Sequence, residues 1–241
     1  MPFGGLHVSG KIVLLRSRKP IPLGGIPVNP RRLVVNLVLL LAACLGAGAV
    51  LMSRVPAQSP GVADVDPHRA YGSKNAPIVM EVFSDFQCPA CKQLNKTTNQ
   101  LLMDNYVNTN KVYLIHRDFP LPMHAYSRIA AHYVRAAAQL GKGEQAEQVL
   151  FQNQEKWEQT GDVDGTLATV FSPAEMAKIR TLAKGTSLDS AIDKDVAMGK
   201  GYNVNQTPTT VIHYKGQTYP VVGVVSYDVL HQFLDQLLSQ H

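Results

Sequence analysis

Cys88 and Cys91 are the residues whose types and spacing most clearly carry chemistry, because they form a C-x-x-C pair. The preceding stretch 78–83 is rich in strand formers, and the following stretch 92–106 contains neither proline nor glycine. The pair therefore lies where a predicted strand passes into a predicted helix. A thiol at a helix start lies near unpaired N–H groups and the positive end of the helix dipole, which favour the thiolate. The spacing indicates a disulfide that exchanges electrons with other proteins.

Three other uses of such a pair compete with this interpretation. A zinc site needs four ligands, and the chain has no second pair to complete one. Haem attachment needs His directly after the second cysteine, where this chain has Lys92. A purely structural Cys88–Cys91 disulfide stays open, although so small a loop gains little stability from closure. We expect no metal and no cofactor other than the redox-active disulfide.

The net charge of +5 comes from the start of the chain. Of the 23 lysines and arginines, seven lie in residues 1–54, which contain none of the 18 acidic residues. The rest of the chain is therefore close to neutral. This distribution indicates a basic leader and excludes a nucleic-acid-binding surface.

Residues 33–52 form an apolar run that predicts a transmembrane segment. As a helix it would span about 30 Å, the thickness of a bilayer's hydrocarbon core. The basic segment 1–32 precedes it, so the positive-inside rule places the N-terminus in the cytoplasm. Residues 53–66 are expected to be a flexible linker, and the domain 67–241 is expected outside the cytoplasm, where disulfides persist.

Two cleaved forms of this leader are alternatives to a single-pass anchor. Residues 41–44 resemble a bacterial lipobox, in which Cys44 would be lipidated after cleavage. Residues 47–49 resemble an ordinary signal-peptidase site, which would give a secreted or periplasmic protein. In the anchored form, Cys44 is a small apolar residue in lipid without a redox role.

The domain 67–241 has a strand, a helix and a strand, then helices, two strands and a last helix. Thr218–Val222 is expected to pair with the strand before it as a hairpin. Within the helical block, Ser172 and Glu175 form a capping-box pattern. The expected strands are 78–83, 111–117, 209–214 and 218–222, and the expected helices include 92–106, 125–140, one from Ser172, one from Ser187, and 227–239.

These motifs together resemble the DsbA-like branch of the thioredoxin superfamily. The residues that carry the resemblance are 83–91, 117–121, His124, 152–154, Trp157 and 206–208. The resemblance covers essentially all of 67–241 and implies an α/β thioredoxin fold, βαβ followed by ββα, with a helical domain inserted at about 123–202.

The resemblance implies a second catalytic motif at Thr207-Pro208. It implies that Pro208 is cis and turns the backbone of Thr207 toward the cysteine sulfurs, where that backbone can pair with an extended substrate. A proline that merely starts a strand is the alternative. Cys88, Cys91 and Pro208 are thus the expected catalytic residues, and Thr207, Pro89 and Ala90 the expected substrate-binding residues.

The chain departs from the family pattern at two positions. Members often carry a buried acid six residues before the first cysteine, and this chain has Val82 there. Glu81, one residue earlier, is a candidate proton acceptor for Cys91, but on a regular strand it faces the other way, and an exposed strand residue is the favoured interpretation. Gln206 occupies a position where many members have glycine.

The two cysteines are expected to differ in burial. Cys88 should be exposed, whereas Cys91 should be buried in phase with Leu94 and Leu101. Asp85 either tunes the thiolate or faces solvent. His124 is expected at a helix start or in packing, and Trp157 inside the helical block.

The sequence therefore predicts a membrane-tethered, monomeric thiol–disulfide oxidoreductase that introduces disulfides into exported proteins. The resemblance implies a DsbB-like or VKOR-like quinone reductase as its membrane partner. A reductase or isomerase with the same residues is one alternative. A non-enzymatic tethered binding or chaperone module with a structural disulfide is another.

Overall fold

The computed structural model describes residues 64–240, and its centre is a mixed sheet. Within this part the strand order is β1-β3-β2-β4-β5; β2 and β3 are parallel, and the other neighbours are antiparallel. The strands are β1 (Ala70–Tyr71), β2 (Ile78–Ser84), β3 (Val112–Asp118), β4 (Thr209–Tyr214) and β5 (Gln217–Val222). The four predicted strands are confirmed to within one residue, whereas the short β1 was not predicted.

One long helical segment follows β2, and its register contains a correction. It comprises α2 (Pro89–Leu94), a π-helical turn, α3 (Gln100–Leu102) and a second π-helical turn that ends at Val107. A π turn takes up more residues than an α turn, so it rotates the residues beyond it. Leu101, predicted to be buried, is 44% exposed, and Leu102 takes its place in the core.

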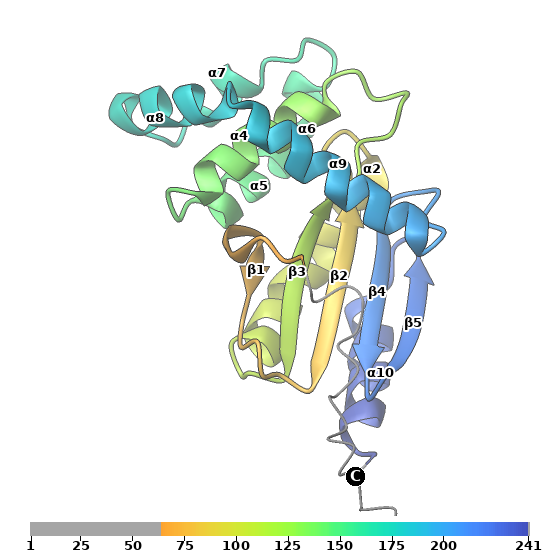
Figure 1. The fold of residues 1–241 in the computed structure, drawn as a ribbon. Helices are drawn as coiled ribbons and strands as arrows, with labels where there is room; N and C mark the ends of the chain where they lie inside the picture. Colours follow the sequence, from red (N-terminus) through yellow and green to blue (C-terminus); the bar gives the residue numbers. More distant parts are fainter. Residues whose placement is uncertain (1–63, 241) are drawn as a thin grey trace, which may run out of the picture. The chain divides into compact units, whose positions relative to one another are not determined.

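The helical block between β3 and β4 is confirmed as an insertion (Figure 1). It lies at the end of the sheet where β2 and β3 finish. The Ser172–Glu175 capping box is present, and Trp157 is fully buried in the core of the block, as predicted. The helices are α4 (Ser127–Ala138), α5 (Gly143–Gln152), α6 (Gln154–Trp157), α7 (Val163–Leu167), α8 (Pro173–Ala183) and α9 (Thr186–Gly201).

Helices contact both faces of the sheet: α10 lies behind it in Figure 1, and α9 crosses the front face near the end where β2 and β3 finish. The helix α10 (Tyr227–Leu238) packs Leu230 and Leu234 in one cluster with Leu94 and Val82. On the opposite face α9 approaches closely. A Cβ atom on Gly199 would lie 2.7 Å from the Phe119 ring, so glycine permits this approach. The arrangement confirms βαβ followed by ββα.

Buried ion pairs join the insertion to the sheet. Arg117 on β3 contacts Glu81 on β2 at 2.7 Å and Asp195 on α9 at 3.0 Å. Arg135 on α4 contacts both Asp118 on β3 and Asp195. Separating these partners would leave buried charges unpaired, at a cost of about 3–5 kcal/mol. The network therefore holds α4 and α9 in place against the sheet.

The predicted basic segment, membrane segment and most of the linker lie outside the described residues. Within residues 64–240, no helix combines the length and the apolar character that a membrane crossing requires.

Candidate active site

The C-x-x-C pair lies where β2 gives way to α2. Cys88 is the N-cap of α2, Pro89 occupies the first helical position, and the Cys88 carbonyl accepts the N–H of Lys92 at 3.2 Å. Proline suits that position because its missing N–H would have no helical partner there. The two thiols are free, so the structure is that of the reduced form.

The Thr207-Pro208 motif lies beside the pair, and its peptide bond is cis, as the resemblance implied. The antiparallel pairing of β2 and β4 sets Phe83 opposite Thr209. The start of β4 is therefore at the same edge of the sheet as the end of β2. The Cys88 sulfur lies 3.3 Å from the Thr207 carbonyl oxygen, to which it donates a hydrogen bond only while it is protonated. This places the Thr207 main chain against the reactive sulfur.

Cys88 is the cysteine that ionises. Hydrogen bonds from the Cys91 thiol, from Thr207 and from the N–H groups of Ala90 and Cys91 outweigh burial and lower the pKa of Cys88 to about 5. Within residues 64–240 the buried Thr207 hydroxyl has no other partner, so it is available to the thiolate. Helix-start cysteines commonly show this effect.

The prediction that Cys88 is exposed is wrong, although Cys88 is more exposed than Cys91. Cys88 is 7% exposed, because the Thr207-Pro208 loop covers one side of the sulfur, and Cys91 is 2% exposed. Pro89 is exposed and Ala90 half-buried, so the helix start offers the accessible surface next to Cys88.

Cys91 remains a thiol at neutral pH. Burial, and then the neighbouring Cys88, raise the pKa of the Cys91 thiol far above its usual value. The Asp85 N–H donates to the Cys91 sulfur at 3.4 Å, and the Ser84 hydroxyl also favours its ionised form. The pair therefore consists of a thiolate, Cys88, and a thiol, Cys91, that donates a hydrogen bond to it.

Asp85 organises the loop before the cysteines. It is 1% exposed, which excludes the solvent-facing alternative. Its carboxylate accepts the N–H groups of Gln87 and Leu121, both at 2.7 Å, and contacts His124 Nδ1 at 2.9 Å. His124 is thus part of the packing around the site, in agreement with its predicted role.

Gln154 is a supporting residue whose function the sequence did not reveal. Its buried side-chain amide donates to the Phe86 carbonyl at 2.7 Å and to the Cys88 carbonyl at 3.2 Å. It thereby ties α6 of the insertion to the reactive loop. In the sequence, only the resemblance of residues 152–154 to the DsbA-like family pointed to Gln154. Its hydrogen-bond partners could not be inferred, because they are 66 and 68 positions away in the chain.

The favoured interpretation of Glu81 as an exposed residue is wrong. Glu81 is 0% exposed, and its carboxylate contacts Arg117, His213 and the Tyr202 hydroxyl. Burial opposes ionisation, but His213 and Arg117 hold the pKa of Glu81 below its usual value. These partners lie on the α9 face, whereas Val82 packs with α2 on the other face. The carboxylate therefore faces away from Cys91.

We expect Glu81→Gln to destabilise the protein without altering the cysteines. Arg117 would lose a buried carboxylate partner, at a cost on the order of 3 kcal/mol in unfolding free energy. Urea denaturation measures that loss, and stopped-flow release of a Cys88 mixed disulfide measures the attack by Cys91. Glu144→Gln, at an exposed position, is the control. A slower Cys91 attack in Glu81→Gln would establish Glu81 as the proton acceptor.

The reactivity of Cys88 should follow its low pKa. Alkylation by iodoacetamide is expected to rise with pH to a midpoint near 5 in the native reduced chain. In the urea-denatured chain the midpoint should be about 8.5. Ionisation of Cys88 therefore stabilises the reduced fold fully above about pH 8.5, and this stabilisation is lost as the pH falls through about 5. A native midpoint near the denatured value would contradict this assignment.

The fold and the paired cysteines define a class of protein: thiol–disulfide oxidoreductases built on a thioredoxin fold with a helical insertion. The family model described as Thioredoxin matches residues 64–235, and the chain belongs to this family. Among residues 64–240, no three His, Cys, Asp or Glu side chains are grouped so that they could hold a metal ion.

Several solved structures share this fold. The structure of α-DsbA1 from Wolbachia pipientis has a TM-score of 0.61 at 16% identity, covering 70% of this chain and 89% of that one. Oxidised BdbD from Bacillus subtilis has a TM-score of 0.58 at 19% identity, with 70% and 92% covered. DsbA2 from Pseudomonas aeruginosa has a TM-score of 0.55 at 24% identity, with 70% and 93% covered. The fold is therefore DsbA-like.

Part of the chain also resembles two curated sequences, the Na⁺/H⁺ antiporters NhaA 3 of Salinispora tropica and NhaA 1 of Salinispora arenicola. The identities are 32% over 105 residues and 34% over 90 residues. The matches cover 41% and 34% of this chain but only 16% and 13% of the antiporters.

Proposed function

We propose that this protein introduces disulfides into exported proteins through its Cys88–Cys91 dithiol. Residues 33–52 anchor it in the cell membrane, with residues 1–32 in the cytoplasm and the domain 67–241 on the extracytoplasmic side of the linker 53–66. The apolar run and the basic leader support this orientation. An oxidising compartment supports a cycle that begins from the disulfide.

The reaction is two successive thiol–disulfide exchanges. A substrate thiolate attacks the Cys88 sulfur of the Cys88–Cys91 disulfide; a mixed disulfide forms, and Cys91 leaves with the electron pair and takes up a proton. A second substrate thiolate then attacks the substrate sulfur of the mixed disulfide, and Cys88 leaves as a thiolate. The substrate loses two electrons as its disulfide forms, and the protein gains those two electrons.

The stability of the Cys88 thiolate favours this direction. At pH 7, two units above a pKa of about 5, ionisation stabilises the reduced form by about 3 kcal/mol. That corresponds to about 60 mV for a two-electron couple, in the sense of a more oxidising protein. The DsbA-like fold of the solved neighbours supports the same direction.

The surface around Cys88 binds both the protein substrate and the partner that accepts the electrons. The Thr207 main chain, with Pro208, Pro89 and Ala90 around Cys88, receives an extended segment of reduced or unfolded protein. A DsbB-like or VKOR-like membrane quinone reductase then reoxidises the dithiol. The protein acts on both partners as a monomer.

The Cys88 sulfur, which lies beside the buried Cys91 thiol and has a pKa of about 5, carries this proposal, and a redox titration tests it. The full chain is equilibrated with glutathione buffers, and its free thiols are then alkylated and counted. We expect a potential nearer to about −120 mV, as for DsbA, than to about −270 mV, as for thioredoxin. A value near the latter would make the protein a reductase. A disulfide that resists mild reductant would favour the binding or chaperone module.

A further inference from the structure

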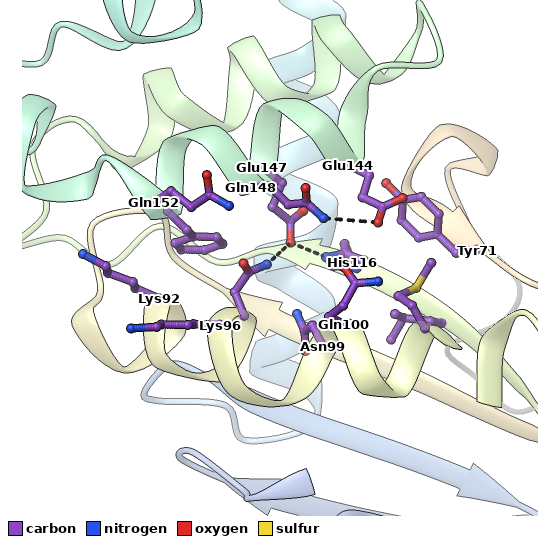
Figure 2. A pocket seen from close by; sticks show the side chains of 14 residues that line it. Tyr71, Lys92, Lys96, Asn99, Gln100, His116, Glu144, Glu147, Gln148 and Gln152 are labelled. Atoms are coloured by element: carbon purple, nitrogen blue, oxygen red, sulfur yellow. Dashed lines mark hydrogen bonds and ion pairs between the residues drawn. The ribbon is translucent and has the colours of Figure 1, made fainter. Parts of the chain in front are cut away.

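Two buried carboxylates near the dithiol are engaged by other partners than the Cys91 sulfur. Glu81 lies on the α9 face of the sheet and pairs there with Arg117 at 2.7 Å. Glu147 on α5 lies across a cavity of about 220 Å³ from the α2–α3 segment and pairs with His116 at 2.9 Å (Figure 2). The Cys91 sulfur gains negative charge when the disulfide opens, so other groups must stabilise that charge.

Two hydrogen-bond donors at the end of β2 lie beside the Cys91 sulfur. The Asp85 nitrogen is 3.4 Å from it. Alternation along β2 places Ser84 on the same face as Val82, which is the face that α2 covers. Burial and Cys88 raise the pKa of the Cys91 thiol, whereas hydrogen bonds from the Ser84 hydroxyl and the Asp85 N–H lower it. Both donors therefore favour the charged sulfur.

The side chain of Asp85 holds its own N–H in this position. The carboxylate is 1% exposed and accepts the N–H groups of Gln87 and Leu121, both at 2.7 Å. It also contacts His124 Nδ1 at 2.9 Å. These partners come from the reactive loop and from the segment after β3, so the main chain of Asp85 is fixed from two sides. Its N–H is directed at the Cys91 sulfur before charge develops there, which avoids a cost of reorganisation.

We propose that the Ser84 hydroxyl and the Asp85 N–H form a binding site for the thiolate of Cys91. When a substrate thiolate attacks the Cys88 sulfur, the S–S bond breaks and its electron pair passes to the Cys91 sulfur, which both donors contact. That thiolate then takes up a proton from the solvent. In the reverse step the same donors stabilise the Cys91 thiolate that attacks a mixed disulfide at Cys88.

Ser84 is thus a catalytic residue, and Asp85 is a positioning residue through its carboxylate. The inference rests on the exchange at Cys88 in the proposed function. It does not depend on the direction of that exchange, because the donors act on the same charged sulfur in both directions.

Oxidation of the reduced full chain by excess oxidised glutathione tests this site in two steps. Cys88 first attacks glutathione and forms a mixed disulfide; Cys91 then attacks the Cys88 sulfur and releases reduced glutathione. Acid quenching and mass spectrometry separate the three forms of the chain. Only the second step requires charge on Cys91. Ser84→Ala removes one donor to a charge that is about half developed, so the second step should be roughly fivefold slower and the first step unchanged.

Two further variants locate the effect. Asp85→Asn replaces one acceptor oxygen of the carboxylate by an amide nitrogen and should slow the second step more than the first. Ser239→Ala, at an exposed position after α10, should leave both steps unchanged. An unchanged second step in Ser84→Ala would overturn the proposal, and so would equal slowing of both steps. If Ser84→Ala does not fold, Asp85→Asn decides by the same comparison.

The redox potential separates this role from a structural one. At neutral pH Cys91 is an uncharged thiol in the reduced chain and part of a disulfide in the oxidised chain, so neither end state carries the charge that the donors stabilise. Ser84→Ala should therefore leave the potential of the full chain unchanged. A shifted potential without a slower second step would contradict the proposal.

The same experiment distinguishes this inference from the proposed function. If Cys88 of the unmodified chain does not react with oxidised glutathione, the proposed function is excluded. If it reacts, and Ser84→Ala matches the unmodified chain in both steps, only the thiolate site is excluded.

Discussion

Cys91→Ala is expected to accumulate mixed disulfides with exported proteins instead of releasing them. In the unmodified chain the Cys91 sulfur can attack a mixed disulfide at Cys88 and free the bound thiol. Alanine removes that escape route and leaves the Cys88 sulfur available. It also removes the Cys91 thiol, the largest single cause of the low pKa of Cys88, so the pKa of Cys88 should rise from about 5.

The trapped species should appear as high-mass bands on a non-reducing gel of whole cells and disappear on reduction. Cys88→Ala is the matched control, because it keeps a buried Cys91 that should form no such bands. Bands in Cys88→Ala, or their absence in Cys91→Ala with Cys88 still alkylatable, would reverse or refute the assigned roles.

Arg135→Met is expected to cause the largest loss of stability in the described domain. Arg135 is 2% exposed and pairs with Asp118, Asp195 and Asp66. Methionine fills similar space but leaves buried carboxylates without this cation, so the free energy of unfolding should fall by about 3–5 kcal/mol. Urea denaturation of the full chain, followed by tryptophan fluorescence, measures the change. Trp157, the single tryptophan, lies in the core of the insertion.

Arg128→Met is the control for this substitution. Arg128 lies on the same helix and pairs with Asp189 and Asp193, but at the surface, where such pairs contribute about 0–1 kcal/mol. An equal loss in both variants would show that burial does not decide the strength of these pairs. A loss below about 1 kcal/mol in Arg135→Met would contradict the role of the network.

The pKa of Asp195 gives the network a pH dependence. Burial, together with the nearby Asp118, raises the pKa of Asp195 to about 6, although Arg135 and Arg117 oppose the shift. A carboxyl with a raised native pKa stabilises the fold when it is protonated. The contribution of Asp195 to the stability is therefore complete below about pH 4 and is lost as the pH rises through about 6.

The local elements could be predicted from sequence because their causes are local. Runs of strand formers give β2, β3 and β4, and the Ser172–Glu175 capping box starts α8. The position of Leu101 could not be predicted, because the π-helical turn before it leaves no pattern in the sequence.

The sequence by itself determined the chemistry of this protein: a C-x-x-C at a helix start, and a Thr207-Pro208 motif ahead of the last hairpin. For the C-x-x-C the residue types and their spacing are sufficient, whereas the role of Thr207-Pro208 followed from the resemblance to the DsbA-like family. Only the tertiary structure decided which face Glu81 occupies, how far Cys88 is covered, and how Gln154 supports it. Those outcomes depend on contacts between residues 66 to 132 positions apart, and packing of distant segments is not encoded in any local pattern.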